Sequence, residues 1–125
     1  MSNSFKFKGV SLATGSETAL LTAASDETII IKSIRVTNNT SNTPTLSFDV
    51  SDSSASAEYT ILKTQTLAAN TAVEILTVSL VLEPSDAIKA TISSTDSIHF
   101  GISYLVITWL HWLIYQTKVL TKPGD

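Results

Sequence analysis

The stretch from Thr28 to Asn38, TIIIKSIRVTN, constrains the fold most, because it is a β-branched apolar run that stops in a cluster of turn residues. Its apolar residues fall into two sets of opposite parity, with Ile30, Ile34 and Val36 in one and Ile29 and Ile31 in the other. Successive side chains of a strand point to opposite faces. Either both faces are covered, or a bulge near Lys32 and Ser33 resets the phase so that all five point inward. Both arrangements need a second layer, which predicts a central strand of a sandwich.

Other runs of alternating apolar and polar residues recur about every 8–12 residues, separated by turn-rich segments such as NNTSNTP and EPSD. We predict strands over residues 17–22, 28–38, 45–51, 59–67, 72–76, 78–82, 87–93 and 98–108. In the strand over 45–51, Leu46, Phe48 and Val50 are expected to face inward. About eight short strands without a helical period predict an all-β fold, an antiparallel β-sandwich that is jelly-roll-like.

The length of 125 residues predicts one domain. We divide it into an N-terminal arm (1–16), a β-sandwich domain (17–108) and a C-terminal extension for assembly contacts (109–125). Phe5 and Phe7 alternate with lysines in the first segment, as in a short edge strand or in an arm docked on a neighbouring subunit.

The C-terminal extension begins with WLHWLIY, which continues the last strand with large apolar groups of both parities and holds both tryptophans. Either the last strand runs longer and covers one end of the core, or the segment packs on a partner subunit. Because Trp and Tyr are favoured anchors of protein interfaces, we favour the second explanation. The candidate interface residues are Phe5, Phe7, Trp109, Trp112 and Tyr115.

Composition excludes several classes of partner. Charged residues make up 15% of the chain, against about 25% in typical domains, and the net charge is −3 with no basic run. Nucleic acid is therefore a poor partner. No apolar run reaches the roughly 18 residues of a membrane-spanning helix, and MSNSFKFKGV has no apolar signal-peptide core. The absence of cysteine excludes disulfides and thiol chemistry.

No motif predicts catalysis, a cofactor or a metal. His99 is expected to point to solvent or to an adjoining subunit, and His111 to have a packing role; neither has a partner at metal-ligand spacing. Two carboxylate pairs, Asp49 with Asp52 or Asp26 with Glu27, are weak candidates for calcium ligands, because the sequence has no EF-hand pattern. The sequence has no nucleophile elbow and no phosphate-binding glycine loop. We therefore expect a protein that is not an enzyme.

Four segments, KSIRVTNNTS, LAANTAVEIL, LVLEPSDAIKATISS and IHFGISYLVIT, resemble small β-sandwich virion accessory proteins of tailed bacteriophages. The resemblance covers roughly Ser11 to Thr108, where the family usually stops, so residues 109–125 depart from its pattern. The motifs are core strands and turns, so they indicate fold more than role, and the family carries no catalytic residues to transfer.

The resemblance implies a capsid decoration or cement protein, or a neck or tail accessory protein, in a virion assembled in the host cytoplasm. The implied partners are other virion proteins, either the major capsid protein or neck and tail proteins. A homo-oligomer is expected, with a trimer favoured. The alternative is a carbohydrate- or receptor-binding β-sandwich, but the loops NNTSNTP and DSSASA offer amides and hydroxyls without an aromatic platform.

Overall fold

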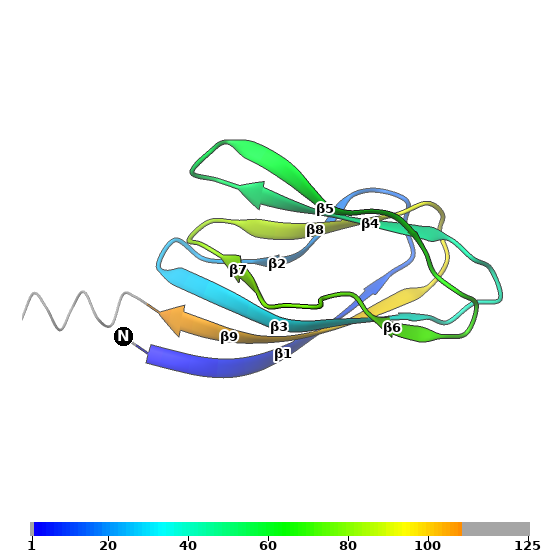
Figure 1. Ribbon diagram of the computed structural model, residues 1–125, viewed down its shortest axis with the longest axis horizontal. Helices are drawn as coiled ribbons and strands as arrows, with labels where there is room; N and C mark the ends of the chain where they lie inside the picture. Colours follow the sequence, from blue (N-terminus) through cyan, green and yellow to red (C-terminus); the bar gives the residue numbers. More distant parts are fainter. Residues whose placement is uncertain (1, 109–125) are drawn as a thin grey trace, which may run out of the picture.

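The computed structural model describes residues 2–108, which form two antiparallel sheets packed as a β-sandwich (Figure 1). The first sheet has the order β1-β9-β3-β6, with β7 also paired to β3, and the second has the order β2-β8-β4-β5. The strands are β1 (Ser2–Leu12), β2 (Thr18–Thr22), β3 (Glu27–Asn38), β4 (Thr45–Asp52), β5 (Ala57–Thr66), β6 (Ala72–Glu74), β7 (Leu80–Leu82), β8 (Ala87–Ile92) and β9 (Ile98–Thr108). No helix in this part of the chain is long and apolar enough to cross a membrane.

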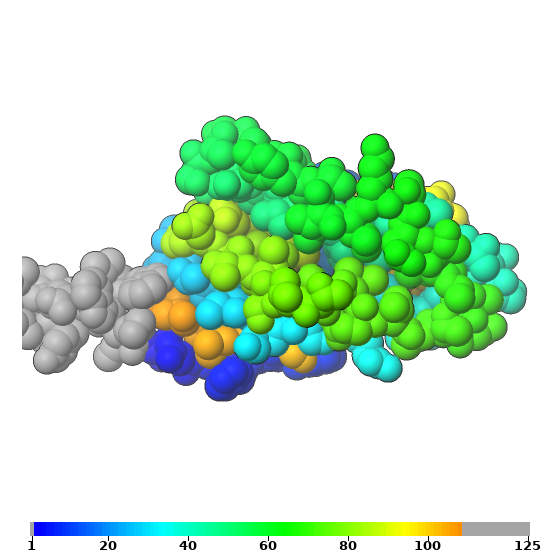
Figure 2. Space-filling view, in the orientation of Figure 1, coloured from blue at the N-terminus to red at the C-terminus, as the bar shows by residue number. Residues whose placement is uncertain are grey.

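The sheet orders confirm the predicted all-β, jelly-roll-like sandwich. Strands β6 and β7 both pair with β3, one near each end, so together they act as one interrupted strand. Counted in this way, the nine strands give the eight-strand arrangement of a jelly roll. The chain crosses from the second sheet to the first between β5 and β6. In Figure 2 the green atoms of β5 and of this crossing segment lie on the face of the sandwich that is turned towards the viewer.

Strand β3 carries a register shift between Ile31 and Ser33 against β9, so the predicted bulge is present. Four of the five apolar side chains are buried on its inner face: Ile29, Ile31, Ile34 and Val36. The alternative in which the bulge points all five inward is wrong for Ile30, because it lies between two inward neighbours and is therefore directed to the outer face. The bulge gives Ile34 and Val36, after it, the same inward orientation as Ile29 and Ile31 before it. It does not turn the three consecutive residues 29–31 to one face.

The core lies between the sheets and draws on both inner faces. Leu46 and Phe48 of β4 are fully buried, as the alternation predicts, and Val50 packs against the core. The rings of Phe48 in one sheet and Phe100 in the other meet edge to face, with centroids 6.0 Å apart. By contrast, the strand predicted over 78–82 begins only at Leu80, and Val78 is 76% exposed.

Strand β1 is an edge strand, paired with β9 along all eleven residues from Ser2 to Leu12. This pairing decides between the two expectations for Phe5 and Phe7, because both belong to the first sheet. Residues that face one another across an antiparallel pair lie on the same side of the sheet. The buried partner pair Leu12 and Ile98 therefore sets the inner face, and Phe5 and Phe7 lie on the outer face.

Candidate functional site

Two of the five predicted interface residues fall within the described part of the chain, and both are exposed. The side chain of Phe5 is 80% exposed and that of Phe7 is 69% exposed. Trp109, Trp112 and Tyr115 lie outside the described residues. The outer face of the first sheet is therefore the surface on which the sequence-based candidates can be examined.

Phe5 begins a row of four apolar side chains that crosses four strands. Leu105 of β9 lies opposite both Phe5 and Ile30, and Ile30 lies opposite Val81 of β7. We call Phe5, Leu105, Ile30 and Val81 the apolar row. Phe5 and Val81, at its two ends, are exposed, and the two central side chains are partly buried by their neighbours. Sequence reasoning could not find this row, because its members come together only through the pairing register.

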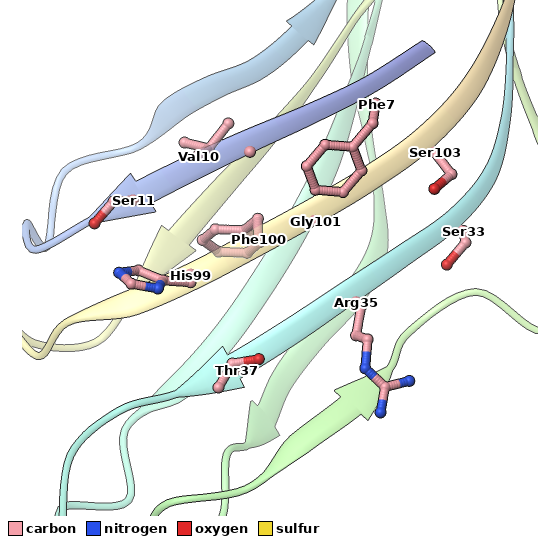
Figure 3. A pocket seen from close by; sticks show the side chains of 11 residues that line it. Phe7, Val10, Ser11, Ser33, Arg35, Thr37, His99, Phe100, Gly101 and Ser103 are labelled. Carbon is pink, nitrogen blue, oxygen red and sulfur yellow. The ribbon is translucent and has the colours of Figure 1, made fainter. Parts of the chain in front are cut away.

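Phe7 lies next to a hollow of about 550 Å³ on the same outer face (Figure 3). The hollow exists because Gly9 of β1 is paired with Gly101 of β9, so no side chain rises from either position. The Phe7 ring leans against the glycines, and a Cβ atom added to Gly101 would lie 3.2 Å from the ring. Ser11, His99 and Thr37 form the neighbouring row across the sheet and line the hollow beyond the glycines.

Among residues 2–108, Arg35 of β3 is the only lysine or arginine that lines the hollow. It is paired with Gly101 on one side and with Glu74 of β6 on the other. The Glu74 carboxylate accepts hydrogen bonds from the Ser33 hydroxyl and, at 2.8 Å, from the Ile34 backbone N–H. Glu74 is thus engaged by β3 backbone and hydroxyl groups. Within residues 2–108 the Arg35 guanidinium makes neither a hydrogen bond nor an ion pair with Glu74 or any other group. His99 is exposed beside the hollow, as expected.

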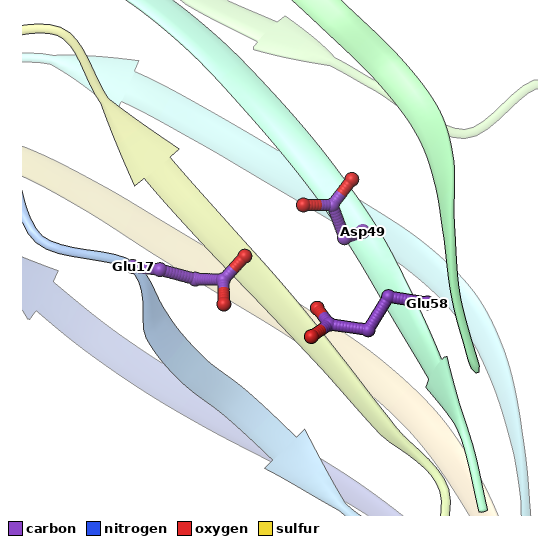
Figure 4. Close-up of side chains that lie close together, drawn as sticks. All are labelled: Glu17, Asp49 and Glu58. Carbon is purple, nitrogen blue, oxygen red and sulfur yellow. The ribbon is translucent and has the colours of Figure 1, made fainter. Parts of the chain in front are cut away.

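Three carboxylates gather on the outer face of the second sheet: Glu17, Asp49 and Glu58 (Figure 4). The weak calcium alternative paired Asp49 with Asp52, whereas the structure groups Asp49 with the other two. The Lys89 ammonium lies 4.0 Å from Glu17 and 3.7 Å from Glu58, so a cation of the protein itself already offsets part of the negative charge of this cluster. Partial desolvation, a hydrogen bond with Asp49 and the charge of Glu58 raise the pKa of Glu17, against the lowering effect of Lys89.

The raised pKa of Glu17 predicts a small pH effect. The folded protein holds this proton above about pH 4.5, where the unfolded chain has begun to release it. The contribution to stability is therefore complete at low pH and is lost as pH rises through the folded pKa. As pH rises from about 4 to about 7, the stability of Glu17→Gln should therefore increase relative to that of the parent, by no more than about 0.5 kcal/mol at this solvent-screened site. Thermal unfolding measures the difference, and Asp26→Asn, outside the cluster, should not reproduce it.

A second carboxylate group, formed by Asp52, Glu83 and Asp86, is structural. The buried Asp86 carboxylate accepts hydrogen bonds from the backbone N–H groups of Ser53 and Glu83, each at 3.0 Å. It thereby joins the loop after β4 to the turn before β8. Hydrogen bonds from Ser54 and Ala55, that of the Ser54 hydroxyl foremost, lower the pKa of Asp52. The carboxylates of Asp52 and Asp86 are thus engaged by local loop contacts.

Neither a protein-family model nor a curated protein sequence matches this chain. Among solved structures, a chain of infectious bursal disease virus (Gx strain) is 10% identical with a TM-score of 0.52, over 86% of this chain and 32% of that one. The Clostridium thermocellum xylanase 10B CBM22-1–GH10 modules, complexed with xylohexaose, give 20% identity and a TM-score of 0.42, over 76% of this chain and 20% of that one. The extra small virus particle of the prawn Macrobrachium rosenbergii gives 11% and 0.37, over 84% and 80%.

These similarities are distant. The chain spans about a third of the viral chain with the TM-score above 0.5 and a fifth of the xylanase chain. At 10% identity the viral similarity establishes a shared β-sandwich fold and no function. The structure thus supports the fold implied by the sequence resemblance, and the assignment to a virion is a separate proposal.

Proposed function

We propose that the protein is a non-enzymatic structural protein of a bacteriophage virion, a capsid decoration or cement protein that acts as a homo-oligomer, with a trimer favoured. The observation that carries the proposal is the apolar row on the outer face of the first sheet. The four sequence segments that resemble phage virion accessory proteins supply the biological setting. Attachment at the neck or tail of the particle is the second candidate, because the same surface suits either location.

The apolar row has the composition of an interface core. Its ends are a phenylalanine that is 80% exposed and a valine that is 52% exposed, and two further apolar side chains join them without a gap. Single exposed apolar residues are common, whereas adjacent ones indicate a contact surface. Burial of one such side chain contributes about 1.5–3 kcal/mol. In a particle this contribution is repeated in every copy, so modest contacts add up to firm attachment.

The C-terminal sequence extends the argument. Thr108 ends β9, the strand that contributes Leu105 to the apolar row. The next seven residues are WLHWLIY, with Trp109, Trp112 and Tyr115 as aromatic anchors. We propose that these anchors contribute to the same subunit contacts as the row. The low charge content of the chain is consistent with close packing of symmetry-related copies, because few like charges are brought together.

The double substitution Phe5→Ser with Val81→Ser tests the proposal. We expect the parent to be a defined oligomer and the variant to dissociate, with a dissociation constant raised at least about 100-fold, because two apolar anchors are removed per subunit. Sedimentation equilibrium of the full-length chain measures the change. Truncation after Thr108 should also weaken assembly and leave a folded monomer.

The matched control is Tyr59→Ser with Val78→Ser. These side chains are 54% and 76% exposed but do not belong to the apolar row, so the control should assemble like the parent. A monomeric parent, or equal weakening by both double variants, would contradict a subunit interface at the row.

A further inference from the structure

The hollow beside Phe7 is built by the sequence and is not a chance irregularity of the surface. Two glycines face one another across β1 and β9, and the rows on both sides of them carry side chains. The result is a depression of about 550 Å³, which lies within the range of small-molecule sites. Its floor is the backbone of a paired sheet, with the Phe7 ring lying against both glycines at one side.

The hollow offers three kinds of contact. One of them, the Arg35 guanidinium, extends from β3 towards β6, so this exposed side chain must turn over the hollow to meet a ligand there (Figure 3). An exposed aromatic ring, Phe7, stands at one side; hydroxyl groups of Ser11 and Thr37 lie with the His99 imidazole at the other (Figure 3). Arg35 supplies the positive charge, and its forked donors are not used by another group of the described chain. A guanidinium of this kind matches a carboxylate in a bidentate arrangement.

We propose that the hollow binds a pyranose unit that bears a carboxylate, such as a uronic or sialic acid residue of an acidic saccharide. The C–H face of the sugar ring packs on Phe7, its carboxylate meets Arg35, and its hydroxyls exchange hydrogen bonds with Ser11, Thr37 and His99. The aromatic platform, missing from the loops, is therefore supplied by a sheet face.

Other ligand classes fit these groups less well. No carboxylate side chain of the described chain lines the hollow, so a metal ion would lack hard anionic ligands from residues 2–108. A nucleic acid needs several cations along its backbone, whereas the part of the chain that the structure describes gives this hollow one arginine, in a protein of net charge −3. A simple anion would use Arg35 but would leave the Phe7 ring without a contact.

The saccharide site and the apolar row occupy different ends of the same face. Along β1 the row is marked by Phe5 and the far side of the hollow by Ser11, six residues away. At about 3.4 Å per residue, they are about 20 Å apart. At its near side, however, the hollow begins at Phe7, only two residues or about 7 Å from Phe5, so a subunit contact at the row would border the ligand. The two proposals are tested by different variants and can fail independently.

The test is an NMR titration of the ¹⁵N-labelled full-length chain with trigalacturonate, its neutral methyl ester, sialyllactose, lactose and inorganic phosphate. At least one of the two acidic saccharides should shift the backbone amides of Gly9, His99 and Gly101. The matching neutral saccharide should bind at least about tenfold more weakly, because it lacks the charge-assisted pair. Equal binding of acidic and neutral forms, equal shifts with phosphate, or no shifts in the hollow would overturn the proposal.

Two variants with matched controls locate the ligand. Arg35→Gln should weaken binding about tenfold or more, whereas Lys32→Gln makes the same change of charge on β3 outside the hollow and should not. Phe7→Ala should weaken binding, and Tyr59→Ala, which removes an exposed aromatic ring outside both the hollow and the apolar row, should leave it unchanged. Dispersed amide spectra of each variant verify the fold. Equal effects of a variant and its control would refute the assigned site.

Discussion

Phe48→Ala is expected to lower the free energy of unfolding by about 3–5 kcal/mol, the cost of removing a large side chain from a closed core. Phe48 is fully buried on β4, and its ring meets Phe100 of the opposite sheet at an interplanar angle of 67°. The substitution therefore removes apolar burial and an aromatic contact that links the two sheets. Urea denaturation followed by circular dichroism measures the loss.

The control for this prediction is the same chemical change on the surface. Phe5 is 80% exposed, so Phe5→Ala should alter the free energy of unfolding by no more than about 0.5 kcal/mol in dilute, dissociated protein. A double-mutant cycle of Phe48→Ala and Phe100→Ala should give a coupling energy of about 0.5–1.5 kcal/mol. Similar losses at Phe48 and Phe5 would show that the sandwich core does not depend on the central aromatic pair.

Alternation in the sequence was sufficient to predict most of the long strands, whereas the eleven-residue β1 was expected only as a short edge strand or an arm. Residues 98–108 were predicted as a strand and form β9 with the same bounds, and the inward parity at Leu46 and Phe48 is confirmed. In a half-buried strand, apolar and polar residues alternate along the sequence, because burial alternates with period two, so the buried face can be predicted from the strand alone. The β3 bulge was also indicated, since the apolar parity changes along TIIIKSIRV, but a single sequence left open whether both faces were covered.

Which residues face one another across neighbouring strands could not be predicted from the sequence. Gly9 and Gly101 are 92 positions apart, and nothing local to either residue indicates that they face one another. The hollow and the apolar row both arise from such pairings. Both short strands were predicted, but with bounds that were too long, for a related reason: β6 and β7 have three residues each, which is too few for alternation to define a face. Val78 continued the apolar pattern but lies in the irregular segment between them.

Asn38 is a second residue whose role was hidden in the sequence, where it opened a run of turn-favouring residues. It ends β3, and its side chain is 1% exposed. The amide nitrogen lies 2.8 Å from the carbonyl oxygen of Asn42, 3.2 Å from that of Leu67 and 3.3 Å from that of Ala68. The amide oxygen accepts hydrogen bonds from the backbone N–H and hydroxyl of Thr40. One buried amide thus holds the loop after β3 against the segment that leaves β5.

Asn38→Ala should therefore destabilise the protein by about 2–4 kcal/mol, because it leaves several buried or partly buried carbonyl and N–H groups without their partner. The neighbouring Asn39→Ala is the matched control: Asn39 is exposed, and its backbone N–H, which the substitution keeps, donates a hydrogen bond to the carbonyl oxygen of Ser97. That control should stay within about 0.5 kcal/mol of the parent in urea denaturation. Hydrogen exchange supplies an independent reading, since Asn38→Ala should speed exchange at Leu67 and Asn70, whose N–H groups bond to Pro44 and Thr40 across the same junction. If Asn38→Ala matched Asn39→Ala in both measurements, the junction would be held by its backbone bonds alone.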